Sequence, residues 1–181
     1  MEKLMKIPFQ VLRDKSWIDR RAMVKAAKRV VNSGHYILGQ NVARFEEDFA
    51  TYLGVKFVIG TANGMDSIEI GLRALGLKRG DEVITTAVTA FATILGIMRS
   101  GATPILAEID PQTGLLNPEE VERKITSKTK ALVLVHLYGH LDRMDEWTDL
   151  TSRNGIELLE DCAQAHLASW NGVSAGSIGA L

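Results

Sequence analysis

Two acids, Glu160 and Asp161, end a short apolar segment, and no lysine or arginine stands beside them. Removing water from a carboxylate costs free energy unless a partner compensates the charge. Open α/β sheets bind ligands at the carboxyl ends of their strands, which is where Asp161 is expected. Asp161 is therefore either part of a ligand site that supplies a cation, or a helix cap or hydrogen-bond hub.

The segment "GTANGMDS", residues 60–67, could hold a phosphate group. A glycine turn that opens a helix, here at Gly64 and Met65, offers free backbone N–H groups and the positive end of the helix dipole. The segment matches neither the P-loop nor the dinucleotide fingerprint. An ordinary turn capped by Asn63 or Asp66 explains the same residues, so both interpretations stay open.

Phe91 follows the expected strand at 81–86, at the same edge of the sheet as the glycine turn. An aromatic side chain there could stack on a flat ring, but the local sequence favours a place in the core. The glycine turn, Phe91 and Asp161 all fall on one edge. Their convergence predicts a ligand site more strongly than any one of the three features does.

The four histidines and Cys162 do not have the spacing of a zinc site, and we expect no metal. Cys162 neighbours Asp161, but consecutive residues of a strand point to opposite faces of the sheet. We therefore interpret Cys162 as structural and not as a nucleophile. A single cysteine is typical of a reducing compartment and leaves no partner for an internal disulfide.

From residue 56 onward, β-branched segments alternate with amphipathic ones. The expected strands are apolar on both faces, as parallel strands covered by helices are; they are 56–61, 81–86, 103–109, 131–137 and 156–160. The expected helices between them are 65–76, 118–125 and 142–155. This alternation predicts an α/β fold with a largely parallel sheet flanked by helices.

The first 55 residues differ, because two helical patterns, 17–34 and 41–54, precede any strand. We expect residues 1–55 to form an N-terminal helical arm and residues 56–181 to form the large domain. The last residues are small, and no closing helix follows the strand that ends at residue 160. A parallel sheet that ends in this way has an uncovered edge. The sequence therefore predicts a truncated large domain.

The composition is that of a globular domain with one core, at 181 residues, 46% hydrophobic residues and a formal net charge of −1. No apolar run reaches the roughly 20 residues of a membrane helix, and segment 1–21 lacks the apolar region of a signal peptide. The sequence has no basic stripe. We expect neither a membrane nor a nucleic-acid partner.

Four segments, taken in order, resemble signatures of the DegT/StrS-type sugar aminotransferases: "GTANGMDSIEIGLRALGLKRGDEVITT", "GATPILAEID", "TKALVLVHLYGH" and "LLEDCAQAH". The resemblance runs from about Tyr36 to Leu181. It implies the aspartate-aminotransferase (type I) fold and the cofactor pyridoxal 5′-phosphate, PLP. It also implies that the chain is the N-terminal half of a longer enzyme.

The resemblance assigns roles to individual residues. Asp161 would bond the protonated pyridine nitrogen of PLP, and Gln164 would lie near the phenolic oxygen of its ring. The backbone amides of Gly64 and Met65 would hold its phosphate. Met65 stands where the family often has a threonine, so a hydroxyl that could contact the phosphate is missing.

The aromatic position of the family also differs in this chain. The family pattern is threonine, aromatic, any residue, alanine, threonine, whereas this chain has "TAFAT". Ala90 therefore takes the ring-stacking position, and Phe91 stands one residue later. Both residues are retained as candidates for contact with the cofactor ring.

The resemblance further implies a catalytic lysine that follows Asp161. The last lysine of the chain is Lys130, so we expect the catalytic lysine beyond Leu181 and the chain alone to be inactive. The implied activity of the full-length enzyme is transfer of an amino group from an amino acid, expected to be glutamate, to a keto-sugar nucleotide. A cytoplasmic homodimer is expected.

Two alternatives stay open. A PLP-dependent sugar dehydratase has the same fold and carries histidine in place of the lysine. A non-catalytic half-domain would serve assembly or regulation. The residues that follow position 181 would distinguish the three hypotheses.

Overall fold

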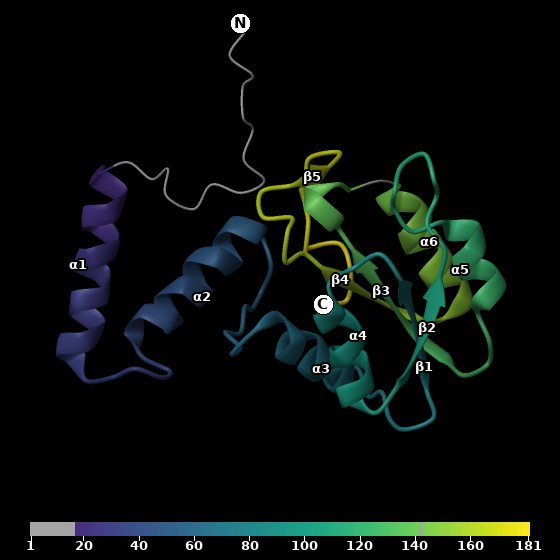
Figure 1. The fold of residues 1–181 in the computed structure, drawn as a ribbon, viewed down its shortest axis with the longest axis horizontal. Helices are drawn as coiled ribbons and strands as arrows, with labels where there is room; N and C mark the ends of the chain where they lie inside the picture. The colour runs from purple at the N-terminus through teal and green to yellow at the C-terminus, as the bar shows by residue number, and fades with distance from the viewer. Residues whose placement is uncertain (1–16, 142) are drawn as a thin grey trace, which may run out of the picture. The chain divides into compact units, whose positions relative to one another are not determined.

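The computed structural model describes residues 17–141 and 143–181, and the chain divides into two compact units (Figure 1). The first unit ends at Glu46, and the second is Glu47–Leu181. The N-terminal helices are α1 (Trp17–Ser33) and α2 (Gln40–Leu53), which confirms the two helices expected there. The division after residue 55 into an arm and a large domain stays a prediction, and the start of that arm, residues 1–16, lies outside the described residues.

Four parallel strands form the central sheet of the second unit, in the order β2-β1-β3-β4. They are β1 (Glu82–Thr86), β2 (Thr103–Ala107), β3 (Thr129–Val135) and β4 (Glu157–Asp161). Val133 of β3 pairs with Leu159 of β4, and Val135 pairs with Asp161. The parallel pairing confirms the α/β fold expected from the sequence.

Side-chain caps and glycines set the ends of several helices of this unit. The helices are α3 (Gly64–Ala74), α4 (Phe91–Ser100), α5 (Pro118–Lys124) and α6 (Met144–Asn154). The Asn63 and Asn117 side chains each accept a 2.9 Å hydrogen bond from the backbone N–H of Asp66 or Glu119, which caps α3 and α5. Gly101 ends α4 with a left-handed backbone, φ 98°, that glycine adopts without strain.

Two short elements complete the second unit. A 3-10 turn, η1 (Leu137–Gly139), follows β3, and a hairpin of two antiparallel strands, β5 (Ser169–Trp170) and β6 (Val173–Ser174), follows β4. No helix among residues 17–141 and 143–181 has the length and apolar character needed to cross a membrane.

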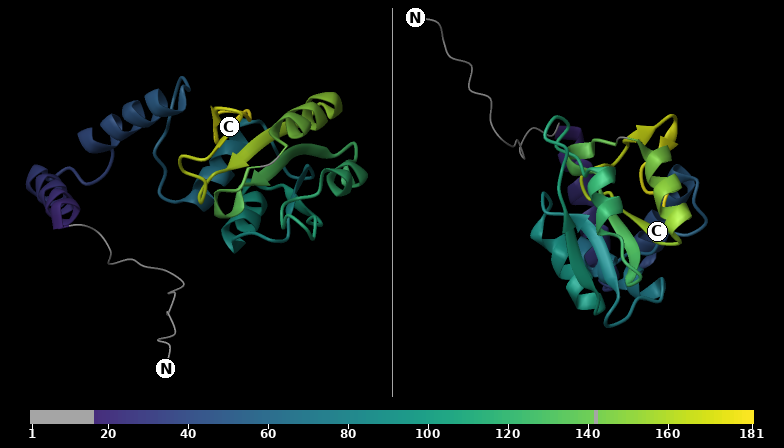
Figure 2. Two further views of the ribbon diagram at one scale, coloured as in Figure 1. Left: turned by 90° about the horizontal axis from the view of Figure 1, so that it is seen from above. Right: turned by 90° about the vertical axis from the view of Figure 1, so that its right-hand side faces the viewer.

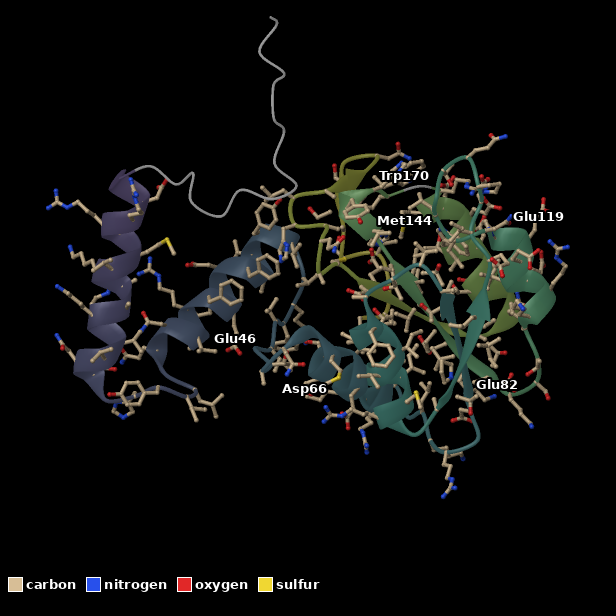
Figure 3. The ribbon with its side chains drawn as sticks, in the orientation of Figure 1. Glu46, Asp66, Glu82, Glu119, Met144 and Trp170 are labelled. Carbon is tan, nitrogen blue, oxygen red and sulfur yellow. The ribbon has the colours of Figure 1, made fainter. Side chains whose placement is uncertain are left out.

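A pair of helices covers each face of the sheet, and Figures 1 and 2 show this arrangement from three directions. Helices α3 and α4 share one core with the strands; its residues include Ile68, Leu72, Val83, Ile97, Ala131, Val133 and Leu159. Helices α5 and α6 share the other; its residues include Ile84, Val121, Leu132, Leu134, Met144 (labelled in Figure 3), Trp147, Leu150 and Leu158. The neighbours Leu158 and Leu159 thus enter opposite cores, as the alternation of a strand requires.

Gly96 allows α3 and α4 to pack closely. A Cβ atom at this position would lie 2.9 Å from the Cβ of Ile68 and 2.9 Å from the carbonyl oxygen of Met65. Real carbon atoms do not approach so closely, so only glycine fits without a shift. The contact fixes the start of α3 against the middle of α4.

The expected strand at 56–61 is wrong, because these residues form no regular secondary structure. The side chains of Phe57 and Ile59 are 73% and 79% exposed. A strand needs a neighbouring strand to pair its backbone groups, and no strand of the described residues pairs with this segment. Segment 56–61 has the apolar pattern of a strand but no partner strand among the described residues.

The edge of the sheet beyond β4 is not left open, contrary to expectation. The N–H of Ala180 donates to the carbonyl of Leu158 (2.8 Å), and the N–H of Glu160 donates to the carbonyl of Leu181 (3.0 Å). A Cβ atom on Gly179 would lie 2.6 Å from the oxygen of Leu158, so this close approach requires glycine. The last residues of the chain thus satisfy backbone groups that an edge strand would otherwise expose.

Candidate functional site

Asp161 ends β4 on the face of the sheet that α3 and α4 cover. The hydroxyl of Thr93 in α4 donates a 2.9 Å hydrogen bond to Oδ2 of Asp161, and the N–H of Ala163 donates a 3.2 Å bond to Oδ1. No lysine or arginine among the described residues forms an ion pair with this carboxylate. Asp161 is therefore held in place by neutral donors, and no cation of the described residues balances its charge.

Thr93 is a site residue that the sequence reasoning missed. Its side chain is 1% exposed, and its hydroxyl also lies 2.9 Å from that of Thr89. One signal could have found it, because Thr93 is the final threonine of "TAFAT". The buried hydroxyl fixes the orientation of the Asp161 carboxylate against the first turn of α4.

Ala90 and Phe91 lie at the start of that same helix. Ala90 is the N-cap residue, with an extended backbone, and Phe91 is the first residue of α4. The ring of Phe91 is 72% exposed, so the expectation of a core position is wrong. The buried residues of α4 are Thr93, Gly96, Ile97 and Ser100, and Phe91 lies outside this set. Phe91 is thus available for contact with a ligand.

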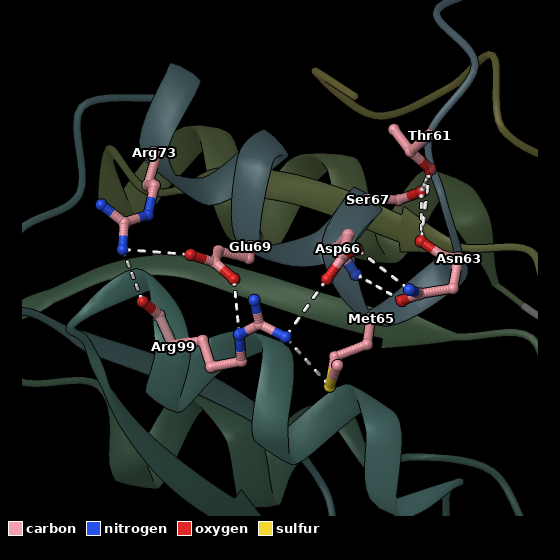
Figure 4. Close-up of polar contacts among 8 residues, drawn as sticks. All are labelled: Thr61, Asn63, Met65, Asp66, Ser67, Glu69, Arg73 and Arg99. Carbon is pink, nitrogen blue, oxygen red and sulfur yellow. Dashed lines mark hydrogen bonds and ion pairs between the residues drawn. The ribbon is translucent and has the colours of Figure 1, made fainter. Parts of the chain in front are cut away.

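The turn before α3, whose side-chain contacts Figure 4 shows, has two backbone N–H groups that bond no acceptor among the described residues. The side chain of Asn63 accepts from the N–H of Asp66 (2.9 Å), and its carbonyl accepts from the N–H of Ser67 (3.1 Å). The N–H groups of Gly64 and Met65 belong to the first turn, where a helix has no internal acceptors. A Cβ atom built on Gly64 meets nothing within 4 Å. Two unpaired donors beside open space fit an anion.

The same turn offers two hydroxyls that the sequence reasoning did not single out. Thr61 and Ser67 lie with their side-chain oxygens 2.6 Å apart, and each hydroxyl also lies 3.2 Å from the carbonyl oxygen of Asn63. These contacts tie the segment before the helix to its first turn (Figure 4). Met65 has no hydroxyl, but Thr61 and Ser67 supply two hydroxyls at the same turn.

Helix α4 contacts both parts of the candidate site. Its first turn bonds Asp161 through Thr93, and its middle, at Gly96, touches the carbonyl of Met65. The structure therefore brings the glycine turn and the acid of β4 to one helix. Sequence reasoning placed these features at one edge of the sheet without identifying the helix that joins them.

Gln164 is oriented by a backbone contact. Its side-chain oxygen accepts a 2.9 Å hydrogen bond from the N–H of Tyr138. Because the oxygen is the acceptor in that bond, the amide NH₂ group faces other partners and is available as a donor. Tyr138 has a left-handed backbone, φ 56°, within the turn η1.

Glu160, the neighbour of Asp161, serves the opposite face of β4. Its carboxylate is fully buried and accepts hydrogen bonds from His136 Nε2 (2.9 Å) and from the N–H groups of Gly176, Ile178 and Gly179 (3.1, 2.8 and 2.7 Å). Burial alone would raise the pKa of Glu160, but the bonds from His136 and from the three backbone donors outweigh it, and the pKa lies below its ordinary value. Glu160 is thus an ionised structural anchor.

Cys162 lies beside this anchor. Burial, together with the charges of Glu160 and Asp161, raises the pKa of the Cys162 thiol to about 12. A thiol with so high a pKa is not a nucleophile near neutral pH. His136, Glu160 and Cys162 have ligating atoms within 4.8 Å of one another, but four hydrogen-bond donors already occupy the carboxylate.

Comparison with known proteins identifies one family. Residues 18–181 match the DegT/DnrJ/EryC1/StrS aminotransferase family. Among curated proteins, a dTDP-3-amino-3,6-dideoxy-alpha-D-galactopyranose transaminase of Aneurinibacillus thermoaerophilus is 44% identical over 173 residues, which are 96% of this chain and 48% of that protein. The chain thus spans about half the length of the curated relatives it matches.

Two solved structures bear on the cofactor. NtdA of Bacillus subtilis with bound cofactor PMP has a TM-score of 0.86 and 34% identity, with 96% of this chain and 40% of that chain covered. GDP-4-keto-6-deoxymannose-3-dehydratase with a trapped PLP-glutamate geminal diamine has a TM-score of 0.79 and 29% identity, with 86% and 42% covered.

Proposed function

The chain belongs to the DegT/DnrJ/EryC1/StrS aminotransferase family, whose members depend on PLP, and we propose that the protein transfers an amino group to a keto-sugar nucleotide. The observation that carries the proposal is the uncompensated carboxylate of Asp161, joined through α4 to the two free amides of Gly64 and Met65. The cofactor PLP carries both a ring cation, which can pair with the carboxylate, and a phosphate, which can accept from the two amides. The residues present therefore fit PLP.

Each candidate residue has a distinct part in the proposal. Asp161 holds a proton at the pyridine nitrogen through a charge-assisted hydrogen bond, which is stronger than a neutral one. The N–H groups of Gly64 and Met65 hold the phosphate, and the amide NH₂ of Gln164 donates to the phenolic oxygen. When bound, PLP supplies the electron sink that amino transfer requires.

Ala90 and Phe91 complete the proposed set as neighbours of the cofactor ring. Ala90 occupies the family's stacking position, and the exposed ring of Phe91 supports a contact one residue later. Thr93 does not touch the cofactor in this proposal. It holds the carboxylate of Asp161 in one orientation.

The covalent anchor of PLP is not assigned within the chain. The last lysine of the sequence, Lys130, precedes β4, and we propose that the catalytic lysine follows Leu181, so that residues 1–181 alone do not turn over. Glutamate as amino donor is supported by the dehydratase structure, which holds a PLP-glutamate adduct. Assembly as a homodimer and a cytoplasmic location belong to the same proposal.

A sugar dehydratase is the second candidate, because one solved relative has that activity. The two functions give different products from one keto-sugar nucleotide. An aminotransferase releases 2-oxoglutarate from glutamate and forms an amino sugar, whereas a dehydratase removes a hydroxyl as water and leaves no nitrogen on the sugar. Mass spectrometry of the product distinguishes them.

The test uses the protein as its gene encodes it and the substitution Asp161→Asn. Asparagine keeps the size of the side chain but carries no charge to hold the ring proton. We expect the melting temperature and most PLP binding to be retained, while single-turnover amino transfer falls by about 100-fold or more. Near-unchanged turnover by a folded, PLP-loaded Asp161→Asn protein would remove Asp161 from the proposed chemistry.

A further inference from the structure

Asp66 introduces a charge conflict at the proposed phosphate site. Its carboxylate stands in the first turn of α3, one residue after Met65. An acid at a helix N-terminus interacts favourably with the helix dipole, but a second anion bound at the same terminus is repelled by it. The charge of Asp66, unless it is compensated, therefore weakens the binding of a phosphate to the N–H groups of Gly64 and Met65.

Arg99, which extends from α4, supplies that compensation (Figure 4). Its Nη1 atom lies 3.2 Å from Oδ1 of Asp66, and its Nε atom lies 2.7 Å from Oε2 of Glu69. One guanidinium thus bridges two acids on α3, which a lysine ammonium cannot match in geometry. The side chain of Arg99 is 50% exposed and those of Asp66 and Glu69 are 26% and 16% exposed, so water screens the contacts in part.

The remaining contacts leave the Asp66 carboxylate with both oxygens engaged. Oδ2 accepts a 2.9 Å hydrogen bond from the side chain of Asn63. Arg73 lies 3.1 Å from Glu69 and donates to the carbonyl of Arg99 (2.7 Å), so two arginines balance two acids. Arg99 is the arginine of this network that contacts Asp66.

We propose that Arg99 is a positioning residue for the phosphate site. Arg99 neutralises Asp66 and holds its carboxylate in contact with Asn63. The N–H groups of Gly64 and Met65 can then donate hydrogen bonds to a second anion. This inference rests on the proposed function, because it concerns the phosphate of the same cofactor. Arg99 acts through Asp66 and does not contact the phosphate itself.

The experiment compares the dissociation constants of PLP and of pyridoxal, which has the same ring and aldehyde but no phosphate. It uses the protein as its gene encodes it, with binding followed by cofactor absorbance and tryptophan fluorescence. In Arg99→Met, we expect PLP to bind about tenfold more weakly and pyridoxal to bind within about twofold of the unsubstituted protein. A purely structural role for Arg99 would weaken both ligands alike.

A double substitution tests the route through Asp66. Asp66→Asn removes the charge and keeps a side chain that can still bond Asn63. Adding it to Arg99→Met should restore PLP binding to within about threefold of the unsubstituted protein. Failure of this rescue would show that Arg99 does not act through Asp66 and would overturn the proposal.

Arg73→Met is the matched control, because Arg73 belongs to the same network but contacts Glu69 instead of Asp66. Its ratio of PLP to pyridoxal affinity should stay within about twofold of the unsubstituted value. A loss of phosphate selectivity equal to that of Arg99→Met would overturn the specific role of Arg99.

Two further outcomes are separable. If Arg99→Met does not fold, Asp66→Asn alone carries the test. Its uncompensated Arg99 charge should strengthen the binding of PLP by about threefold relative to that of pyridoxal. An unchanged or weaker preference for PLP overturns the proposal. If the unsubstituted protein shows no preference for PLP over pyridoxal, the proposed phosphate site itself is wrong. An unsubstituted preference that Arg99→Met leaves intact overturns only the role of Arg99.

Discussion

The hydroxyl of Thr93 lies 2.9 Å from Oδ2 of Asp161, and the two residues come from a helix and a strand separated by 68 positions in the sequence. The contact joins the first turn of α4 to the carboxyl end of β4. Thr93 has no charge and is almost fully buried, so its contribution to chemistry can be separated from its contribution to packing.

Thr93→Val and Thr93→Ser make that separation. Valine keeps the shape and removes the donor to Asp161, whereas serine keeps the donor and removes a methyl group. Each change should lower the free energy of unfolding by about 1 kcal/mol. Turnover should fall about tenfold only in Thr93→Val, because Asp161 loses its orientation there. Steady-state kinetics beside thermal melting checks this, and equal turnover in both variants would contradict it.

Acid should destabilise the protein through Glu160. Because its pKa is lowered in the folded state, its contribution to stability is complete above the ordinary value of 4.5 and is lost as the pH falls through the lowered value. Glu160→Gln should cost about 3 kcal/mol near neutral pH and should flatten the loss of stability below about pH 4.5. Urea unfolding at a series of pH values measures both effects.

Glu157→Gln is the control for that experiment, because Glu157 is an exposed glutamate on the same strand. Its free energy of unfolding should stay within about 0.5 kcal/mol of the unsubstituted protein. A pH dependence that is unchanged in Glu160→Gln would show that the buried carboxylate does not govern the acid response.

Gly96→Ala should separate α3 from α4. The added methyl group meets Ile68 and the carbonyl of Met65 at 2.9 Å, and overpacking of this kind costs about 1–3 kcal/mol. Gly64→Ala, where nothing lies within 4 Å, should leave the melting temperature unchanged or slightly raised. A Gly96→Ala protein as stable as Gly64→Ala would disprove the close contact.

Cys162 should resist alkylation in the folded protein. With the pKa of its thiol at about 12, the thiolate fraction near pH 7.5 is smaller than that of an ordinary cysteine by about 1,000-fold. Iodoacetamide labelling, mapped to Cys162 by mass spectrometry, should be slow in buffer and rapid in guanidinium chloride. Comparable rates in both conditions would contradict the buried, inert thiol.

The sheet could be predicted because its strands carry their own signal. Segment 131–137 is apolar on both faces, which only a strand between two helix layers requires, and β3 lies there. Segment 56–61 has a similar pattern but no partner strand, and partnership cannot be read from local sequence. Helix α4 was missed because "FATILGIMRS" follows a strand with no polar cap, and the structure shows no side-chain cap there.

The site could be predicted only in outline, for a related reason. Asp161 and the glycine turn stand out as residue types in unusual places. The contacts that give them meaning are long-range, such as Thr93 with Asp161 or Arg99 with Asp66, and no spacing rule links those positions. The exposure of Phe91 also depends on which face of α4 the sheet covers. The roles of Gly64, Met65, Ala90, Phe91, Asp161 and Gln164 toward PLP stay predictions.

The different lengths of the Glu160 and Asp161 side chains distinguish the native register of β4 from a slipped one. A slip of one residue against β3 would still place an acid on each face, so charge alone does not select the native pairing. Glutamate, with one more methylene, reaches His136 and the amides of Gly176, Ile178 and Gly179, while the shorter aspartate meets Thr93. The order of the two acids along the chain, glutamate before aspartate, therefore determines which face of the sheet each residue of β4 lies on.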